Sequence, residues 1–383
     1  MNKKKLGIFI ILGLLMTGSS FSQALSKVET NKLLWEYVGS LPAQKGYEKN
    51  AGLAGLLQGT IGEYIVVGGG ANFPDVLEKG GKKVTHRDIY LLKEVKGKLE
   101  TLEQIQLAYP IGYGLSVSVK EENAIYYLGG SPEKEHSRDI LKITLEKGKL
   151  KTKIVGQLPL SVENGVAQYK DGKIYYGVGK LENPEGKNVN SNKFFSYDIK
   201  TGKVEELADF PGEARQQTIG QILNNKFYVF SGGSNVSYID GYAYDFKTKS
   251  WEKAADVIID KKEILLLGAN SIKIAEDKML VLGGFNYKLW NDANHYLSTL
   301  KDEALQEYKK EYFGAEPSWY GWNRKILIYN ASNNTWKALG EVPFDASCGA
   351  ALLKLKDNIY SINGEIKPGV RTERMFKGTV VSY

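Results

Sequence analysis

The sequence predicts an all-β protein built as a closed ring of six four-stranded blades, and three observations support this prediction. A strand-like phrase that ends in glycines recurs six times along the chain. Counted from Gly69, the glycine recurs at Gly130, Gly179, Gly233 and Gly284, in steps of 61, 49, 54 and 51 residues. A period near fifty is typical of kelch repeats. The two ends of the chain carry complementary parts of one further blade. We therefore expect a six-bladed kelch-type β-propeller.

Each copy of the phrase joins β-branched or aromatic residues to terminal glycines, which is the composition of a strand followed by a tight turn. The six copies are Tyr64–Gly70, Ile125–Gly130, Ile174–Gly179, Phe227–Gly233, Met279–Gly284 and Ile359–Glu365. A variable loop, an aromatic strand and then a tryptophan follow several copies, as in Tyr244 to Trp251 and Tyr329 to Trp336. These later segments predict the outer two strands of each blade.

The last blade is predicted to close through both ends of the chain. Residues 374–383 supply its third strand, and no fourth strand follows them. A matching strand with a terminal Leu-Pro lies instead near the start, from Trp35 to Pro42. We expect this N-terminal strand to complete the last blade, which removes a free sheet edge.

The longest interruption of the repeat, residues 285–322, predicts a helical insertion. Its apolar and aromatic residues fall on one helical face. They are Leu297, Leu300, Ala304, Leu305, Tyr308 and Tyr312. We expect this stripe to pack on the rim of the propeller, with the lining of a pocket as the alternative.

The first 24 residues have the pattern of a cleaved signal peptide. Lys3, Lys4 and Lys5 precede an apolar run too short to span a bilayer, and the segment ends in small residues at Ala24. We expect export to the periplasm and one propeller domain over residues 25–383, with no membrane segment once the signal is removed. An uncleaved anchor is the alternative.

Charge and cysteine content exclude several classes of protein. Without the signal segment the chain has 48 basic and 44 acidic side chains, a difference of +4, which makes no case for nucleic acid and favours small anions only weakly. Cys348 is the one cysteine, so no internal disulfide forms, and its apolar surroundings indicate a buried packing residue. His86, His136 and His295 are scattered over different loops. We expect surface histidines rather than metal ligands.

The sixth copy of the phrase differs from the others because a carboxylate, Glu365, stands where the second glycine is expected. Pro368 and Gly369 favour a tight turn that would bring Arg371 back toward it. A guanidinium beside a carboxylate is either a salt bridge that ties down a loop or a site for acid/base chemistry. In the second case, the arginine holds a substrate carboxylate through two hydrogen bonds while the glutamate moves a proton.

The run Asn363–Thr372 resembles the signature of the N-acetylneuraminate epimerases, kelch propellers that interconvert the anomers of sialic acid. Residues 210–233 resemble the family's opening blade and residues 33–130 its closing blades, so the similarity covers the mature chain in cyclically permuted order. The resemblance implies that Glu365 is the proton acceptor and Arg371 its partner. It also suggests Arg215, Asn72 and Arg87 as substrate-binding residues, each with a structural role as the alternative.

The reaction that this resemblance implies opens and recloses a sugar ring and needs no metal or other cofactor. The expected partner is a small anionic sugar, sialic acid. A sialidase is disfavoured because its Ser-x-Asp-x-Gly-x-x-Trp turns are absent, and a copper oxidase because the histidines are dispersed. The main alternative is a non-catalytic kelch module that binds a glycan or a protein through exposed aromatics. Its candidates are Trp290, Trp319, Tyr320 and Trp322.

Overall fold

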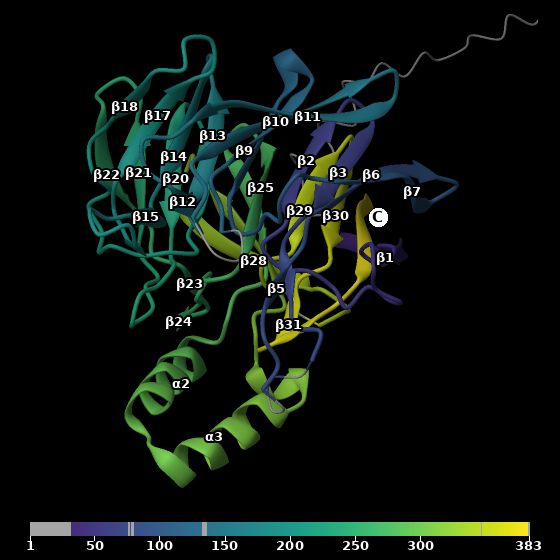
Figure 1. Ribbon diagram of the computed structural model, residues 1–383. Coiled ribbons are helices and arrows are strands. Elements are labelled where there is room, and N and C mark those ends of the chain that lie inside the picture. The colour runs from purple at the N-terminus through teal and green to yellow at the C-terminus, as the bar shows by residue number, and fades with distance from the viewer. Residues whose placement is uncertain (1–31, 76, 78–79, 132–135, 346, 382–383) are drawn as a thin grey trace, which may run out of the picture.

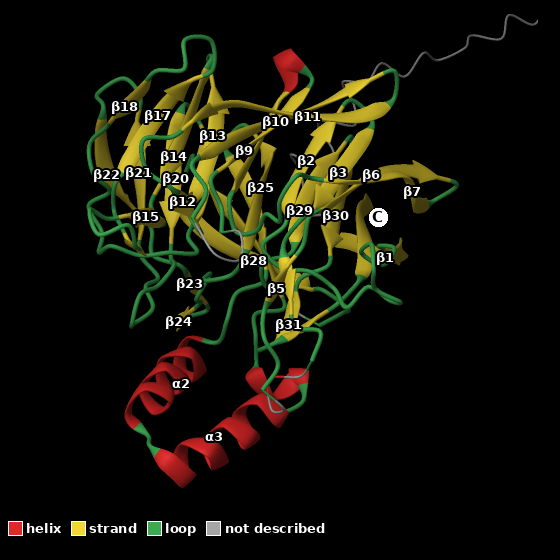
Figure 2. Ribbon diagram, in the orientation of Figure 1, coloured by secondary structure: helices red, strands yellow, loops and turns green. Residues whose placement is uncertain are grey.

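The computed structural model of the chain describes residues 32–75, 77, 80–131, 136–345 and 347–381. The expected signal peptide, residues 1–24, lies outside the described residues. Strands dominate this part of the chain, and its two α-helices stand together in one insertion (Figure 2). Neither helix is long and apolar enough to cross a membrane.

Six four-stranded antiparallel sheets form the described part of the fold, and we number them blades 1 to 6 in chain order. Blade 1 contains β2 (Leu57–Ile61), β3 (Tyr64–Gly68), β6 (Asp88–Val95) and β7 (Lys98–Gln106). Blade 2 contains β8 (Leu115–Val119), β9 (Ala124–Leu128), β10 (Asp139–Glu146) and β11 (Lys149–Gln157). Blade 3 contains β13 (Val166–Lys170), β14 (Lys173–Gly177), β17 (Phe194–Asp198) and β18 (Val204–Glu206).

The second half of the ring follows the same plan. Blade 4 contains β19 (Ile219–Leu223), β20 (Lys226–Phe230), β21 (Gly241–Asp245) and β22 (Ser250–Ala254). Blade 5 contains β25 (Asn270–Ala275), β26 (Lys278–Leu282), β27 (Lys325–Asn330) and β28 (Thr335–Glu341). Blade 6 contains β29 (Ala351–Leu355), β30 (Asn358–Ile362), β33 (Arg374–Val381) and the N-terminal β1 (Lys32–Ser40). The predicted all-β class and the six blades are confirmed.

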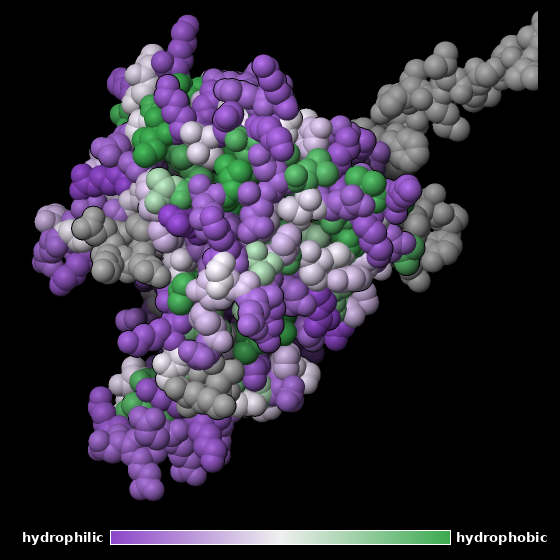
Figure 3. Space-filling model, turned by 45° about the vertical axis from the view of Figure 1, so that its right-hand side comes forward, coloured by the Kyte–Doolittle hydropathy of each residue, from purple (hydrophilic) through white to green (hydrophobic). Residues whose placement is uncertain are grey.

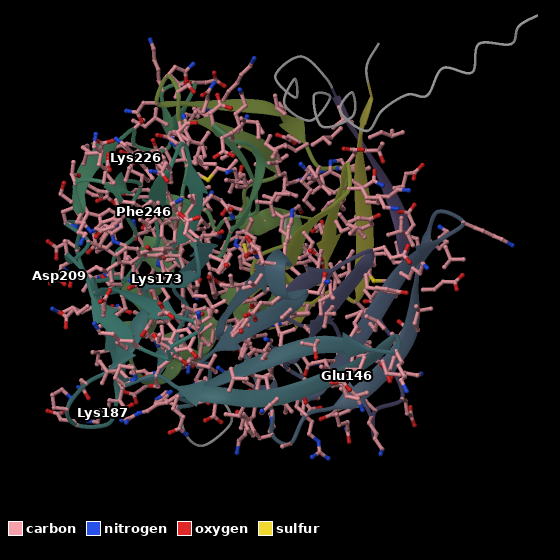
Figure 4. The ribbon with its side chains drawn as sticks, turned by 90° about the horizontal axis from the view of Figure 1, so that it is seen from above. Glu146, Lys173, Lys187, Asp209, Lys226 and Phe246 are labelled. Atoms are coloured by element: carbon pink, nitrogen blue, oxygen red, sulfur yellow. The ribbon has the colours of Figure 1, made fainter. Side chains whose placement is uncertain are left out.

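The first strands of the blades surround the axis of the ring. Each contacts the first strand of the next blade, in the cycle β2, β8, β13, β19, β25, β29 and back to β2. Blade 6 is completed by the antiparallel pairing of β1 with β33, in which Trp35 lies opposite Gly378. In Figure 4 the purple N-terminal strand accordingly lies beside the yellow C-terminal strands. The predicted closure is confirmed, and β33 has a hydrogen-bonded strand on both sides.

The hydrophobic core is divided among the gaps between neighbouring blades. In blade 4, Trp251 lies opposite Tyr244 on the adjacent strand, and its ring is 5.1 Å from that of Phe194 in blade 3. In blade 5, Trp336 lies 4.9 Å from Phe230 of blade 4. Each tryptophan packs its own blade against the preceding one by edge-to-face contact. This packing is the physical reason for the recurrent Tyr…Trp pattern.

One face of the ring carries the longer connections, and we call it the insertion face. In an antiparallel blade the second and fourth strands end on the side where the first strand begins. The connections that follow the second and fourth strands therefore lie on this face. The small sheets on this face are β4 (Ala71–Asn72) with β5 (Val84–Thr85), β12 (Val162–Glu163) with β15 (Lys180–Glu182) and β16 (Asn188–Asn190), β23 (Ile258–Ile259) with β24 (Lys262–Glu263), and β31 (Glu365–Lys367) with β32 (Val370–Arg371). In Figure 1 this face is the lower side of the ring, where the labels of β5, β23, β24 and β31 lie. At the opposite face the connections are tight, and one contains the 3-10 turn η2 (Lys120–Glu122).

The insertion after β26 contains two helices, not the single helix expected. They are α2 (Tyr287–Thr299) and α3 (Asp302–Gly314), followed by the 3-10 turn η3 (Pro317–Tyr320). Leu300 and Lys301 have extended backbone and interrupt the helix. The predicted apolar stripe therefore crosses a break. We call residues 287–320 the helical arm.

The helical arm projects from the insertion face (Figure 1). Its buried residues Ala293, Tyr312 and Tyr320 form a cluster with other residues of the same insertion. The expected packing of the stripe on a blade is therefore wrong for most of its length. On the face shown in Figure 3, the arm at the bottom of the view is mainly hydrophilic.

Two consecutive left-handed residues follow the second strand in most blades. Gly129 and Gly130 have φ angles of 64° and 93°, and a Cβ at Gly129 would lie 2.4 Å from a backbone oxygen of the next blade. In blade 6 the equivalent residues are Asn363, with φ of 60°, and Gly364, with φ of 105°. Glu365 therefore follows the left-handed pair and does not replace its second glycine. It begins a strand, where a side chain is accommodated without strain.

Candidate active site

A two-stranded hairpin at the insertion face brings Glu365 and Arg371 together. Their Cα atoms are direct partners in the pairing of β31 with β32. Pro368 and Gly369 make the turn, and Gly369 takes a φ of 80°, as the third residue of a type II turn requires. Nη1 of Arg371 lies 3.1 Å from Oε1 of Glu365. The predicted turn and the predicted proximity are both present.

The backbone of Glu365 is fixed by blade 6. Its N–H donates to the oxygen of Cys348 at 2.7 Å, and the N–H of Cys348 donates back at 2.8 Å. The N–H of Gly369 donates to Oε1 of Glu365 at 2.8 Å. Both contacts of the carboxylate thus fall on Oε1, and Oε2 has no hydrogen bond to a described residue. That oxygen is available to a ligand.

Burial dominates the electrostatics of Glu365. The loss of water around the carboxylate raises its pKa above the ordinary value, while Arg371, the N–H of Gly369 and the ammonium of Lys83 oppose this shift. The side chain nevertheless keeps 17% of its surface exposed. Such a carboxyl group is reachable from the cavity and can exchange a proton closer to neutral pH than a surface glutamate.

Arg371 is buried with unused hydrogen-bonding capacity. Its side chain is 5% exposed, and its Nε and Nη1 have no hydrogen-bond acceptor among the described residues. The contact with Glu365 is therefore an ion pair without hydrogen-bond alignment. The guanidinium lies 4.7 Å from the ring centroid of Phe73. A buried guanidinium with two free donors is suited to a planar anion such as a carboxylate.

The backbone of Arg371 and Thr372 packs closely against Gly52. A Cβ placed on Gly52 would lie 2.5 Å from the nitrogen of Thr372 and 2.6 Å from the carbonyl carbon of Arg371. Asn72 is buried and donates from Nδ2 to the oxygen of Gly52 at 3.0 Å. Asn72, predicted to bind substrate, therefore lies near the site as a residue that positions the backbone behind Arg371.

A cavity of about 900 Å³ runs along the axis of the ring and includes Glu365 in its lining. Residues at the start of all six first strands surround it on the insertion face. Tyr113 and Phe285 are aromatic members of that lining. The volume is in the range of small-molecule sites, so the carboxylate lies at the mouth of a space large enough for a sugar.

Tyr113 and Lys83 belong to the site but were not predicted from the sequence. The Nζ of Lys83 lies 4.8 Å from the ring centroid of Tyr113. Burial raises the pKa of the Tyr113 hydroxyl, Arg371 lowers it and Glu365 raises it again, so the phenol lies within electrostatic reach of both members of the pair. One sequence signal could have pointed to Tyr113. It stands two residues before the first strand of its blade, at the position that Gly55 has in blade 1.

The structure does not bring Arg215 to the Glu365–Arg371 pair. Arg215 is fully buried in blade 4 and forms a bidentate ion pair with Asp240. Its guanidinium lies between Phe210 and Tyr238, 5.1 and 4.1 Å from their ring centroids. It does not border the axial cavity. These contacts give Arg215 a structural role, and nothing in the geometry favours substrate binding.

Arg87 and the three histidines differ in how far they are exposed to solvent. Arg87 is exposed and donates to Gln106 at 3.2 Å. His136 and His295 are exposed as expected. His86 is only 5% exposed, and its Nε2 lies 2.8 Å from Oδ1 of Asn72, so the prediction of a surface histidine is wrong for this residue. It closes the hydrogen-bond chain that supports Gly52.

Among the described residues, no group of three or more His, Cys, Asp or Glu side chains is placed to hold a metal ion. Cys348 is buried, and its burial raises the pKa of the thiol far above the usual range. This agrees with the predicted packing role. The chemistry that the described residues offer at this site is proton transfer and anion binding.

The comparisons with known proteins point to one family. The model of the family described as N-acetylneuraminate epimerase matches residues 156–382. The N-acetylneuraminate epimerase of Yersinia enterocolitica is 30% identical over 238 residues, which are 58% of this chain and 56% of that protein. The one of Salmonella typhi is 28% identical over 230 residues, which are 57% of this chain and 56% of that protein. The match thus spans little more than half the length of these curated relatives.

A solved structure of the protein YjhT is 25% identical to the chain, with a TM-score of 0.50 over 58% of this chain and 66% of that one. The fold and site define a kelch-type β-propeller whose axial cavity opens beside a buried carboxylate and guanidinium. The family model covers well over half of the sequence and includes both residues of the pair. The chain belongs to the N-acetylneuraminate epimerase family.

Proposed function

We propose that this protein is a sialic acid mutarotase, which interconverts the α and β anomers of N-acetylneuraminate. The observation that carries the proposal is the Glu365–Arg371 pair, in which Oε1 and Nη1 are 3.1 Å apart. Glu365 borders the axial cavity, and Arg371 is buried beside it. Membership of the epimerase family supports the class of reaction.

Anomer exchange opens the sugar ring and closes it again. Glu365 takes the proton of the anomeric hydroxyl, and the electrons of that O–H bond form the C2 ketone. The bond from C2 to the ring oxygen breaks, and Glu365 returns the proton to the ring oxygen. Rotation about the C2–C3 bond presents the other face of the ketone, and the same steps in reverse close the ring. A positioned general base contributes roughly a hundredfold to ten-thousandfold.

Arg371 determines which part of the sugar meets Glu365. Its Nε and Nη1 have no acceptor among the described residues, so the guanidinium keeps N–H donors free for the C1 carboxylate of the substrate. C1 and C2 are bonded, so a carboxylate held at Arg371 places the anomeric carbon beside the neighbouring glutamate. Oε2 of Glu365 faces no competing donor within the described chain.

The raised pKa of Glu365 serves both halves of the cycle. A carboxyl group with an ordinary pKa is a weak base at neutral pH, because it gives up its proton too readily. Burial shifts the pKa upward, which brings proton uptake and proton return closer in free energy. In ring opening and again in closure, one carboxyl group can then take the proton from one oxygen of the sugar and return it to the other.

A cyclic permutation of the blades accounts for the extent of the family match. The match begins at residue 156, so blade 1 and nearly all of blade 2 fall outside it. If the blades of this chain are in cyclically permuted order, a single linear alignment with the family can follow the chain only up to the point where the order is broken. We place the enzyme in the periplasm, on the signal-peptide pattern of residues 1–24.

The test is proton NMR of freshly dissolved β-N-acetylneuraminic acid, with and without the protein. We expect faster appearance of the α anomer, and loss of this acceleration in Glu365→Gln with the fold retained. Glu373→Gln, on the same loop but outside the cavity lining, is the matched control and keeps the wild-type rate. Wild-type activity in Glu365→Gln would exclude Glu365 as the base. Retention of sialic acid without acceleration would instead identify a binding module.

A further inference from the structure

Six left-handed residues form a ring at the mouth of the axial cavity. Each stands two residues before the first strand of its blade, and each borders the cavity. They are Gly55, Tyr113, Asn164, Gln217, Gly268 and Gly349, with φ angles of 68°, 61°, 53°, 54°, 79° and 62°. Backbone hydrogen bonds connect neighbours: Gly349 to Gly268, Gly55 to Gly349, Tyr113 to Gly55, Asn164 to Tyr113 and Gln217 to Asn164, at 2.6–2.9 Å. We call these six residues the mouth ring.

The mouth ring has two unlike halves. Blades 5, 6 and 1 contribute glycine, which adopts a positive φ without cost. Blades 2, 3 and 4 contribute Tyr113, Asn164 and Gln217, although a side chain disfavours this conformation. Because glycine satisfies the same backbone geometry on the other side, the fold alone does not require these three side chains.

The glycine half carries the catalytic pair. Glu365 is hydrogen-bonded to Cys348, the neighbour of Gly349, and the backbone of Arg371 packs on Gly52, three residues before Gly55. The pair therefore lies where blades 6 and 1 meet. In a ring of six blades, the junction of blades 3 and 4 lies diametrically opposite. Asn164 and Gln217 occupy that opposite side.

The two amides differ from the others around the cavity. Four further amide side chains border it, and each binds a backbone group of a neighbouring blade: Gln58 accepts from Leu352, Gln168 donates to Gly220, Gln221 donates to Ser271 and Asn270 donates to Ala350. The side chains of Asn164 and Gln217 make no hydrogen bond to the described residues. Each has a free donor and a free acceptor.

Tyr113 belongs with the catalytic pair rather than with the amides. A Cβ on Gly55 would lie 2.4 Å from its ring, so the ring covers the glycine of blade 1. The aromatic residues Tyr113 and Phe285 therefore border the cavity on the side of Glu365. A ligand held at the pair lies between aromatic walls and extends toward free amides.

We propose that Asn164 and Gln217 bind the hydroxylated tail of the sugar acid, the part farthest from its carboxylate. This inference rests on the proposed function, because Arg371 must hold the carboxylate end. The substrate class is then a long 2-keto sugar acid that reaches across the cavity mouth. Short 2-keto acids meet the catalytic pair but not the amides.

The test compares two ligands with the same anomeric centre. N-acetylneuraminate has the polar tail, whereas 2-keto-3-deoxygluconate has the carboxylate and the anomeric carbon without that tail. Asn164→Gly and Gln217→Gly are the variants, since glycine suits the left-handed backbone and the fold is retained. Gln216→Ala is the control, because Gln216 is adjacent in sequence but does not border the cavity. Dissociation constants come from calorimetry or NMR titration.

We expect each glycine variant to weaken N-acetylneuraminate binding about five- to tenfold, the effect of one lost hydrogen bond. Binding of 2-keto-3-deoxygluconate stays unchanged, as do both constants in Gln216→Ala. Equal losses for the two ligands, or none for either, would overturn the tail assignment. The dissociation constants are measured independently of the rate of anomer exchange. A wild type that shows the binding pattern without accelerating exchange would retain this inference and remove the proposed function.

Discussion

Lys367 joins the helical arm to the hairpin of Glu365. Its Nζ donates to the backbone oxygens of Ala315 at 2.8 Å and of Phe313 at 3.2 Å. Helix α3 ends at Gly314, so the ammonium binds where the last carbonyl groups lack helical partners and the helix dipole is negative. Since Lys367 is two residues from Glu365, the arm and the Glu365–Arg371 pair share one supporting element.

Lys367→Met is expected to loosen the arm. Hydrogen bonds from a charged group contribute about 1.5–3 kcal/mol, so amide hydrogen exchange in residues 302–314 becomes faster while the blades keep their protection. Exchange measured by mass spectrometry reports both regions at once. Lys288→Met is the matched control, because Lys288 is 85% exposed in the first turn of α2 and forms its ion pair with Asp292 of the same helix. Unchanged exchange in α3 would show that the arm is held by other contacts.

Gly52→Ala is expected to reduce activity through the backbone behind Arg371. Gly52 has a φ of 76° and Gly46 one of 94°, so alanine at either position adds left-handed strain of about 1 kcal/mol. A Cβ at Gly52 meets the backbone of Thr372 at 2.5 Å, whereas nothing lies within 4 Å of one at Gly46. We expect Gly52→Ala to have the lower melting temperature of the two variants, because only its Cβ meets backbone atoms, and we expect loss of anomer exchange in its folded fraction alone. Equal rates would mean that the loop of Arg371 adapts.

Arg215→Met is expected to destabilise the fold rather than weaken substrate binding. It leaves Asp240 without its bidentate partner, and losing one member of a buried ion pair costs about 3 kcal/mol. Thermal unfolding should show a melting temperature lower by several degrees, and the folded fraction should bind sialic acid as wild type does. Arg87→Met, at an exposed site, should change stability by less than about 0.5 kcal/mol. A large loss of affinity without a loss of stability would restore Arg215 as a binding residue.

Glu365 predicts opposite pH dependences for stability and activity. Its folded-state pKa lies above the ordinary 4.5. Between 4.5 and that higher pKa, the folded protein keeps a proton that the unfolded chain has lost. Below pH 4.5 both states carry the proton, and the contribution of Glu365 to the free energy of unfolding is fully present. As pH rises through the window, the unfolded chain is favoured by losing its proton first, so this contribution falls. Activity rises through the same window, because the base must be ionised.

Both profiles are measurable against Glu365→Gln. The difference in unfolding free energy between wild type and variant should decrease from pH 4.5 upward, and the enzyme-dependent exchange rate should increase. A rate already constant above pH 4.5 would contradict a raised pKa.

The Glu365–Arg371 pair was predictable because its geometry is local. Arg371 stands six positions after Glu365, and Pro368 with Gly369 specifies the turn between them. The closure by β1 was predictable because its strand pattern matches what blade 6 lacks. The break at Leu300 was not, since the apolar spacing continues through it and only the backbone angles show the interruption.

The sequence by itself determined the number of blades, their closure and the hairpin of Glu365 and Arg371, because each depends on a repeated pattern or a short turn. Tertiary structure decided what surrounds the pair. Asn164 and Gln217 come from blades far from Glu365 in sequence and reach the cavity through left-handed backbone that residue type does not reveal. The surroundings of Arg215 were not predictable for the same reason, since they depend on Asp240, 25 residues away, and on burial between two rings. Contacts between distant segments form only when the ring closes, so no local pattern records them.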